Sequence, residues 1–177
     1  MNRADLSNLA VWKEVGKVTV ESVTVPEPAP HEVVVKVRTS GLCGTDLHIA
    51  AGEFPAARPG IILGHEYAGE VAALGSKVTN FKLGDRVTVD PNIPCHQCEL
   101  CRAGLPHLCE TPGAIGSRNH GGLAQYAVCP AAQVYRLPDT LEFGAAMLAE
   151  PLACTVHAID RAQIRCGDKV LVIGAGP

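Results

Sequence analysis

Four cysteines crowd into one short part of the chain. Residues 95–101 have the sequence CHQCELC, and Cys109 follows after seven further residues. Four thiolates can close a tetrahedral shell around Zn²⁺, and two-residue spacers let neighbouring sulfurs converge on one ion. Such a shell has no open coordination position, so the pattern predicts a structural zinc. The predicted ligands are Cys95, Cys98, Cys101 and Cys109.

Cysteines this close together could also form disulfides, stay as free buried thiols, or hold an iron–sulfur cluster. Disulfides or free buried thiols are disfavoured, because the chain has no export signal and is larger than the small secreted domains that depend on disulfides. An iron–sulfur cluster would use closely spaced cysteines. Here, however, the last gap is seven residues long, and Glu110 rather than a proline follows Cys109. We therefore favour zinc.

A second set of potential metal ligands is spread along the chain. Cys43 lies in the sequence GLCGTDLH, His65 and Glu66 are adjacent, and Glu150 comes much later, before a proline. Three protein ligands of these types plus an exchangeable fourth position make a catalytic zinc site. Each residue also has a simpler interpretation: core packing for Cys43, a polar pair for His65 and Glu66, and helix N-terminal electrostatics for Glu150. The three remaining cysteines lack metal-like neighbours and are expected to be structural: Cys129, Cys154 and Cys166.

Short strands must position most of these residues. Up to about Tyr135, short apolar–polar alternations are interrupted often by glycine and proline, which is typical of a β-barrel or sandwich. Val33, Val35 and Val37 are expected on one face of a strand. Further strands are expected at residues 17–21, 67–74, 86–90 and 124–129.

The pattern changes near Asp139. Residues 141–149 are rich in alanine and leucine and predict a short helix. Pro151 suits the first turn of a second helix, in which Leu152, Val156 and Ile159 recur at helical spacing. The chain therefore changes from β to mixed structure at this point.

The last residues resemble the start of a nucleotide-binding turn. The apolar run 170–173 is typical of a strand buried on both faces, and Gly174 and Gly176 follow it. A dinucleotide-binding fingerprint needs a third glycine that opens a helix and an acidic residue roughly 20 positions later. We expect residues 151–177 to be the start of a truncated Rossmann domain, which leaves NAD and NADP both open.

Composition excludes several partners. The 177 residues are 47% hydrophobic and 19% charged, with a net charge of −3 and scattered basic residues. We expect no nucleic-acid and no membrane partner, because neither a basic cluster nor an apolar run of roughly 18 residues is present. Residues 1–14 do not form a secretory signal, so we expect a soluble, cytoplasmic protein.

Four motifs together resemble one enzyme family, the zinc-dependent medium-chain dehydrogenases. They are CGTDxH at residues 43–48, GHExxGxV at 64–71, GDRV at 84–87 and the tetracysteine segment. They follow in order through almost the whole chain. The resemblance implies a mainly β, GroES-like catalytic barrel over residues 1–150, with a zinc lobe at about 91–112, and then the first helix and strand of a truncated Rossmann α/β domain over 151–177.

The same resemblance assigns roles to individual residues. It implies a catalytic zinc held by Cys43, His65 and Glu66, with Glu150 as a fourth or alternating ligand. Thr45 and His48 match the polar path that carries the released proton outward. Gly174 and Gly176 match the first glycines of the cofactor-binding turn.

The function implied is metal-assisted hydride transfer between a secondary alcohol or polyol and NAD or NADP. Glu-Pro-Leu at 150–152 resembles the polyol, butanediol and threonine dehydrogenase branch, whereas a cysteine is often found at the position of Glu150 in the alcohol dehydrogenase branch. We expect the full-length parent to be a homo-oligomer and this portion alone to be inactive. The alternative is a free-standing zinc-binding GroES-like module with a structural or interaction role, but such a module has no use for an open metal site.

Overall fold

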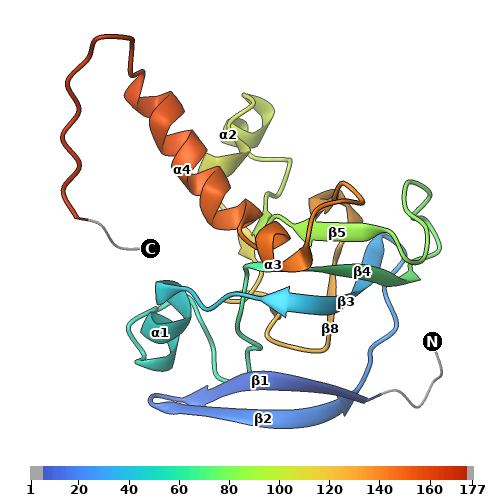
Figure 1. The fold of residues 1–177 in the computed structure, drawn as a ribbon. Helices are drawn as coiled ribbons and strands as arrows, with labels where there is room; N and C mark the ends of the chain where they lie inside the picture. Colours follow the sequence, from blue (N-terminus) through green and yellow to red (C-terminus); the bar gives the residue numbers. More distant parts are fainter. Residues whose placement is uncertain (1–5, 175–177) are drawn as a thin grey trace.

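The computed structural model describes residues 6–174 and is built around a five-stranded antiparallel sheet (Figure 1). Its strands pair in the order β8-β3-β4-β5-β9. Their bounds are Tyr126–Pro130 for β8, Glu32–Ser40 for β3, Tyr67–Leu74 for β4, Arg86–Val89 for β5 and Val134–Arg136 for β9. The strands predicted at 67–74, 86–90 and 124–129 are therefore confirmed within one or two residues. β9 was not predicted separately.

A hairpin of β1 (Leu6–Glu14) and β2 (Lys17–Thr24) completes the barrel. The segment 122–125 joins it to the main sheet. The Ala10 N–H donates to the Leu123 carbonyl at 2.8 Å, and the Val37 N–H of β3 donates to the Gln125 carbonyl at 2.9 Å. One segment thus bonds to β1 and to β3, which closes the β structure. β1 was not predicted, although it contributes Leu9, Val11 and Trp12 to the core.

The hairpin explains why β2 keeps its valines in solvent. The predicted strand at 17–21 is confirmed, but Val18 and Val20 are 43% and 78% exposed. β2 pairs only with β1 among the strands of residues 6–174. Its outward face therefore has no second layer of described structure to bury these side chains.

The main core lies inside the curved sheet. Eleven buried residues form it: Val33, Val35, Tyr67, Val71, Phe81, Val87, Val89, Ile115, Ala127, Cys129 and Val134. The prediction that Val33, Val35 and Val37 share one face of β3 is confirmed, because Val33 and Val35 belong to this core and Val37 packs against it. Val34 is fully buried as well, but it does not belong to this cluster. The register against β4 shifts between Val34 and Val35 and again between Val37 and Thr39.

A small lobe extends from the sheet between β5 and β8. It contains β6 (Asn92–Ile93), α2 (Glu99–Arg102), the 3₁₀ turn η1 (Pro106–Leu108) and β7 (Gly113–Ala114). A second 3₁₀ turn, η2 (Ala131–Gln133), links β8 to β9. The lobe has few hydrophobic core residues of its own. We therefore expect its cysteines to stabilise its fold.

Three helices lie outside the sheet. α1 (Gly44–Ala50) follows β3, and α3 (Phe143–Ala146) is the short helix predicted over 141–149. α4 (Ala149–Ala162) places Pro151 in its first turn as predicted. α4 crosses the domain boundary expected at residues 150–151, and that boundary stays a prediction.

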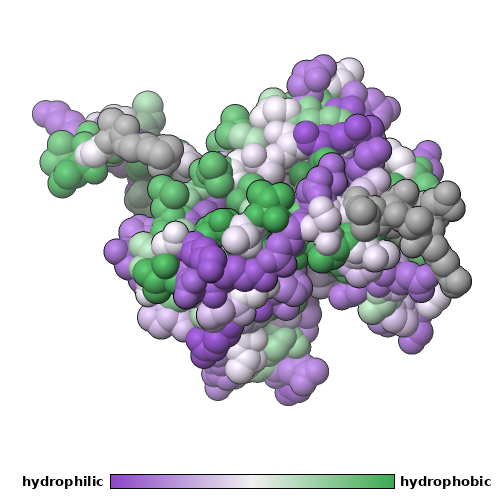
Figure 2. All heavy atoms as spheres, turned by 90° about the horizontal axis from the view of Figure 1, so that it is seen from below, coloured by the Kyte–Doolittle hydropathy of each residue, from purple (hydrophilic) through white to green (hydrophobic). Residues whose placement is uncertain are grey.

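The segment after α4 differs from its prediction. Residues 170–173 were expected to form a strand buried on both faces, but they carry no strand assignment, and Ile173 is 91% exposed. This segment projects from the body with apolar atoms on its surface (Figures 1 and 2). A strand of a parallel sheet needs neighbouring strands, and no described strand lies against this segment.

Candidate functional site

The four cysteines of the lobe converge on one point. The sulfur atoms of Cys95, Cys98, Cys101 and Cys109 all lie within 4.8 Å of one another. The Cys95 and Cys101 sulfurs are 4.0 Å apart. Tetrahedral Zn–S bonds of about 2.3 Å place sulfurs roughly 3.8 Å apart, so the arrangement matches a single four-coordinate ion. Sulfur atoms this close together can all bind one metal ion, whereas an iron–sulfur cluster with several irons would hold its cysteine sulfurs further apart.

Backbone amides stabilise the charged form of these thiols. The N–H groups of Gln97 and Cys98 donate to the Cys95 sulfur at 3.4 and 3.3 Å, and they lower the pKa of the Cys95 thiol to about 6. Burial and the neighbouring sulfurs raise the pKa of Cys101 to about 12. Without a cation the four thiols cannot all ionise together. A divalent metal would remove that conflict, which is the chemistry expected of a structural zinc site.

The disulfide alternative is wrong for this fold. All eight cysteines are free. Cys129 is buried in the main core, as expected for a structural cysteine, and Cys166 is exposed. The sulfur of Cys154 donates to Glu150 Oε1 at 3.7 Å. The expectation that Cys154 has no metal-like neighbour is therefore wrong.

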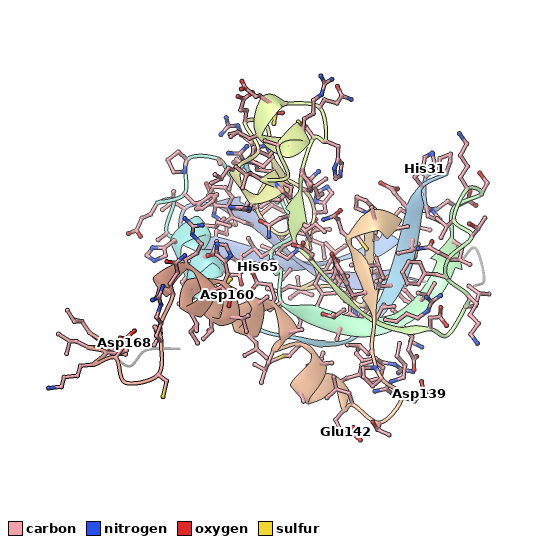
Figure 3. The ribbon with its side chains drawn as sticks, turned by 90° about the horizontal axis from the view of Figure 1, so that it is seen from above. His31, His65, Asp139, Glu142, Asp160 and Asp168 are labelled. Atoms are coloured by element: carbon pink, nitrogen blue, oxygen red, sulfur yellow. The ribbon has the colours of Figure 1, made fainter. Side chains whose placement is uncertain are left out.

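A second group of ligand atoms forms where two distant segments of the chain meet. The Cys43 sulfur, a His65 ring nitrogen and a Glu66 carboxylate oxygen lie within 4.8 Å of one another. Figure 3 labels the position of His65, and the electrostatic effect of His65 on Glu150 indicates that the start of α4 lies near this group. One sulfur, one nitrogen and one carboxylate oxygen suit zinc, and three protein ligands leave a coordination position open. The sequence predicted this convergence through the family resemblance, and the ligand roles stay predictions.

Asp46 connects the segments that carry these ligands. Its carboxylate accepts from the Cys43 N–H at 3.0 Å at the start of α1, and from the buried Gly64 N–H at 2.9 Å. The His65 Nδ1 atom lies 3.9 Å from the same carboxylate. Only 2% of the Asp46 side chain is exposed. One buried acid therefore sets the position of Cys43 relative to His65.

Two glycines leave the space that the site requires. A Cβ atom on Gly41 would collide with Oε2 of Glu66, and the Gly41 N–H already donates to the Glu66 carbonyl at 2.7 Å. Gly64 has φ of +89°, and its Cβ would lie 2.7 Å from the Leu123 backbone nitrogen. Glycine is the residue that adopts this conformation without steric cost. The turn that presents His65 and Glu66 depends on that conformation.

Glu150 lies near this group without belonging to the converged set. Burial raises the pKa of the Glu150 carboxyl. The nearby His65 lowers this pKa, and the nearby Glu66 raises it. Glu150 also lines a cleft of about 580 Å³ between α4 and the barrel, together with Asp90, Asn92 and His157. Its role as a fourth or alternating ligand stays a prediction.

The two predicted proton-relay residues lie on α1 with Cys43. The Cys43 sulfur and the Thr45 hydroxyl oxygen are 3.7 Å apart, and Thr45 is half-buried. His48 is exposed one turn further along, and its Nδ1 atom lies 2.6 Å from Oε2 of Glu53. α1 thus carries Thr45 beside the predicted ligand Cys43 and His48 at the exposed surface.

The predicted cofactor turn is only partly described. Gly174 is exposed with φ of +99°, and Gly176 lies outside the described residues. The apolar positions Leu152, Val156 and Ile159 of α4 are 60%, 49% and 53% exposed. None of these residues contributes to the converged metal groups.

Asp46 and Glu53 are the site residues that sequence reasoning missed. Asp46 had a usable signal, because an acidic residue three positions after a helix N-cap often bonds back to that cap. Glu53 had none, since its contact with His48 depends on how the helix ends.

Comparison with known proteins agrees with this geometry. Residues 29–139 match the family model of the alcohol dehydrogenase GroES-like domain. The chain is 39% identical over 163 residues to a sorbitol dehydrogenase of Halalkalibacterium halodurans, which covers 92% of this chain and 47% of that protein. It is 39% identical over 171 residues to an L-threonine 3-dehydrogenase of Stenotrophomonas maltophilia, which covers 94% of this chain and 50% of that protein.

A solved structure shares the fold closely. A protein of Sinorhizobium meliloti assigned as a zinc-binding dehydrogenase, with NADP bound, superposes with a TM-score of 0.85 at 41% identity over 89% of this chain and 46% of that one. The chain thus spans about half the length of the curated relatives it matches. Among residues 6–174, no helix is long and apolar enough to cross a membrane.

Proposed function

The chain belongs to the zinc-dependent medium-chain dehydrogenases and carries their alcohol dehydrogenase GroES-like domain, and from this premise we propose that it forms the catalytic-domain portion of an oxidoreductase for secondary alcohols or polyols. The observation that carries the proposal is the convergence of Cys43, His65 and Glu66, with Thr45 beside them. A purely structural domain does not need three ligands around an open position.

We propose that Cys43, His65 and Glu66 hold a catalytic zinc, with Glu150 as a fourth or alternating ligand. When bound, zinc supplies Lewis acidity that favours ionisation of an alcohol hydroxyl near neutral pH. Asp46 orients His65 and the start of α1. Thr45 and His48 carry the released proton away from the site. The tetracysteine group holds a second zinc that keeps the lobe folded.

Polar groups beside the site support a polyhydroxylated substrate. The cleft next to Glu150 is lined by Asp90, Asn92 and His157, which can hydrogen-bond hydroxyl groups. Named relatives act on sorbitol and on L-threonine, so polyols, vicinal diols and a hydroxy amino acid are the leading classes. A reducing cytoplasmic setting, which keeps the eight cysteines as free thiols, is part of the proposal.

The hydride acceptor in this proposal is NAD or NADP. A relative of the same fold was solved with NADP bound. The acceptor would be held by a domain that follows Gly174 in the full-length parent. Hydride transfer needs donor and acceptor held together, and this proximity contributes several kcal/mol to catalysis. Residues 1–177 alone should therefore neither bind NAD(H) nor oxidise an alcohol.

Metal content provides the first test. Purified without chelator, the 177-residue chain should contain two zinc ions per molecule, and a Cys43→Ser variant should contain one. Equal zinc content in the two proteins would contradict the assignment of Cys43.

Activity provides the second test. Fusing the chain to the C-terminal half of the Halalkalibacterium halodurans sorbitol dehydrogenase should restore turnover, followed by NADH or NADPH absorbance over a panel of polyols and diols. The Cys43→Ser fusion is the control and should be inactive. A zinc-loaded fusion without turnover on any secondary alcohol would contradict the proposal.

A further inference from the structure

The end of helix α1 places an acid directly against the proposed relay histidine. His48 Nδ1 and Glu53 Oε2 are 2.6 Å apart. The two side chains are 65% and 63% exposed, so the pair lies at the protein surface. The sequence motif at residues 43–48 does not include Glu53.

The backbone explains why these two residues meet. The Glu53 N–H donates to the His48 carbonyl at 2.8 Å, and the Gly52 N–H donates to the Ile49 carbonyl at 2.9 Å. With Gly52 at φ of +76°, these two bonds form a Schellman motif. In that motif the side chains at the positions of His48 and Glu53 usually make an apolar contact. Here the same geometry holds an acid against an imidazole.

Other charged groups near α1 are engaged elsewhere. α1 contacts β1. In β1, Lys13 forms an ion pair with Glu21 of β2, and Glu14 forms an ion pair with Lys17. Asp46, on α1 itself, accepts from the backbone of Cys43 and Gly64. Glu53 is therefore the charged side chain that the structure places on the His48 ring.

A carboxylate can only accept a hydrogen bond, so the pair requires the proton of neutral His48 to sit on Nδ1. The lone pair is then on Nε2. We propose that Glu53 is a positioning residue: it fixes His48 in the Nδ1–H tautomer and so presents Nε2 as the proton acceptor of the relay. This inference rests on the proposed dehydrogenase function.

In alcohol oxidation, hydride with its two electrons leaves carbon for the nicotinamide ring, and the hydroxyl proton leaves through Thr45 to His48 Nε2. The imidazolium that results lies against the Glu53 carboxylate, which stabilises its charge. Because His48 is exposed, it then releases the proton to solvent.

The tautomer can be measured directly on the zinc-loaded 177-residue chain. Long-range ¹H–¹⁵N correlation spectra above the titration range distinguish a protonated ring nitrogen from an unprotonated one, and a His48→Gln variant identifies the signals. We expect Nδ1–H for His48 in the wild type and in Glu53→Gln, whose amide oxygen can still accept. Glu53→Ala should shift His48 towards the Nε2–H form. An unchanged His48 spectrum in Glu53→Ala would overturn the inference.

Kinetics of the active fusion enzyme test the consequence. Glu53→Ala should lower kcat roughly two- to fivefold, in line with a surface ion pair, and leave KM unchanged because Glu53 touches no substrate. Glu53→Gln should recover part of the loss, and the exposed Glu142→Ala control should match the wild type. An unchanged kcat in Glu53→Ala refutes the positioning role. An inactive wild-type fusion refutes the proposed function instead. In that case the ¹H–¹⁵N spectra of the 177-residue chain still test whether Glu53 fixes the His48 tautomer.

Discussion

The buried Asp46 carboxylate accepts a hydrogen bond from the Gly64 backbone N–H, with 2.9 Å between the nitrogen and Oδ1. This contact joins the helix that begins after Cys43 to the turn that presents His65. It spans 18 residues of sequence and belongs to neither predicted metal group. The segments of the predicted metal site are therefore held together by an acid that is not itself predicted to bind the metal.

Replacing Asp46 by alanine should weaken both the fold and the metal site. The buried Gly64 N–H would lose its partner, which costs about 1–3 kcal/mol of unfolding free energy. Zinc bound at Cys43 and His65 should be lost more readily, while the lobe keeps its ion. Urea unfolding and zinc analysis measure the two effects. Asp139→Ala, at an exposed position, is the control. Equal unfolding free energy and equal zinc content in the two variants would show that Asp46 does not hold the site together.

Adding one methyl group at Gly41 should perturb the open site alone. The new Cβ would meet Oε2 of Glu66, so the Gly41→Ala variant must move that carboxylate. We expect weaker zinc binding at the Cys43 group and no change in the tetracysteine lobe, measured by competition with a chelator. Gly144→Ala, where a Cβ meets nothing within 4 Å, should bind zinc as the wild type does. Unaltered affinity in Gly41→Ala would argue against Glu66 as a ligand.

Replacing Cys98 by serine should remove the lobe zinc. Three remaining thiolates leave an incomplete shell, and structural zinc contributes directly to folding free energy. One ion per chain should be lost, and the protection of residues 92–114 from hydrogen exchange should fall while the main sheet stays protected. Cys166→Ser, at an exposed cysteine outside both groups, should keep both ions. Retention of two ions in Cys98→Ser would refute the four-cysteine assignment.

Asp85 should make part of the stability dependent on acid. The backbone N–H of Lys82 and the Arg136 guanidinium hold the pKa of the Asp85 carboxyl below its usual value. A depressed pKa in the folded state adds stability above the unfolded-state pKa, and this stability is lost as pH falls through the folded pKa. Asp85→Asn should therefore be less stable than the wild type at pH 7, with the difference shrinking towards pH 3. A difference independent of pH would show that the charge of Asp85 does not contribute.

The sequence by itself determined the tetracysteine lobe. Its ligands fall within residues 95–109, and short spacers fix the approach of neighbouring sulfurs through local backbone geometry. The strands at 67–74 and 86–90 could also be predicted, because alternation and glycine punctuation are local signals. For Cys43, His65 and Glu66, the residues alone left simpler interpretations open. Only their order within the family pattern pointed to one site.

The tertiary structure decided what depends on segments far apart in sequence. Barrel closure through residues 122–125 made β1 part of the core, and tertiary packing also buried Val34 on β3. The bond from Gly64 to Asp46 and the contact between Glu53 and His48 follow from how α1 begins and ends. Local spacing determines contacts within a turn or two of chain. Contacts between segments require the register and closure of the whole sheet, which no single segment encodes.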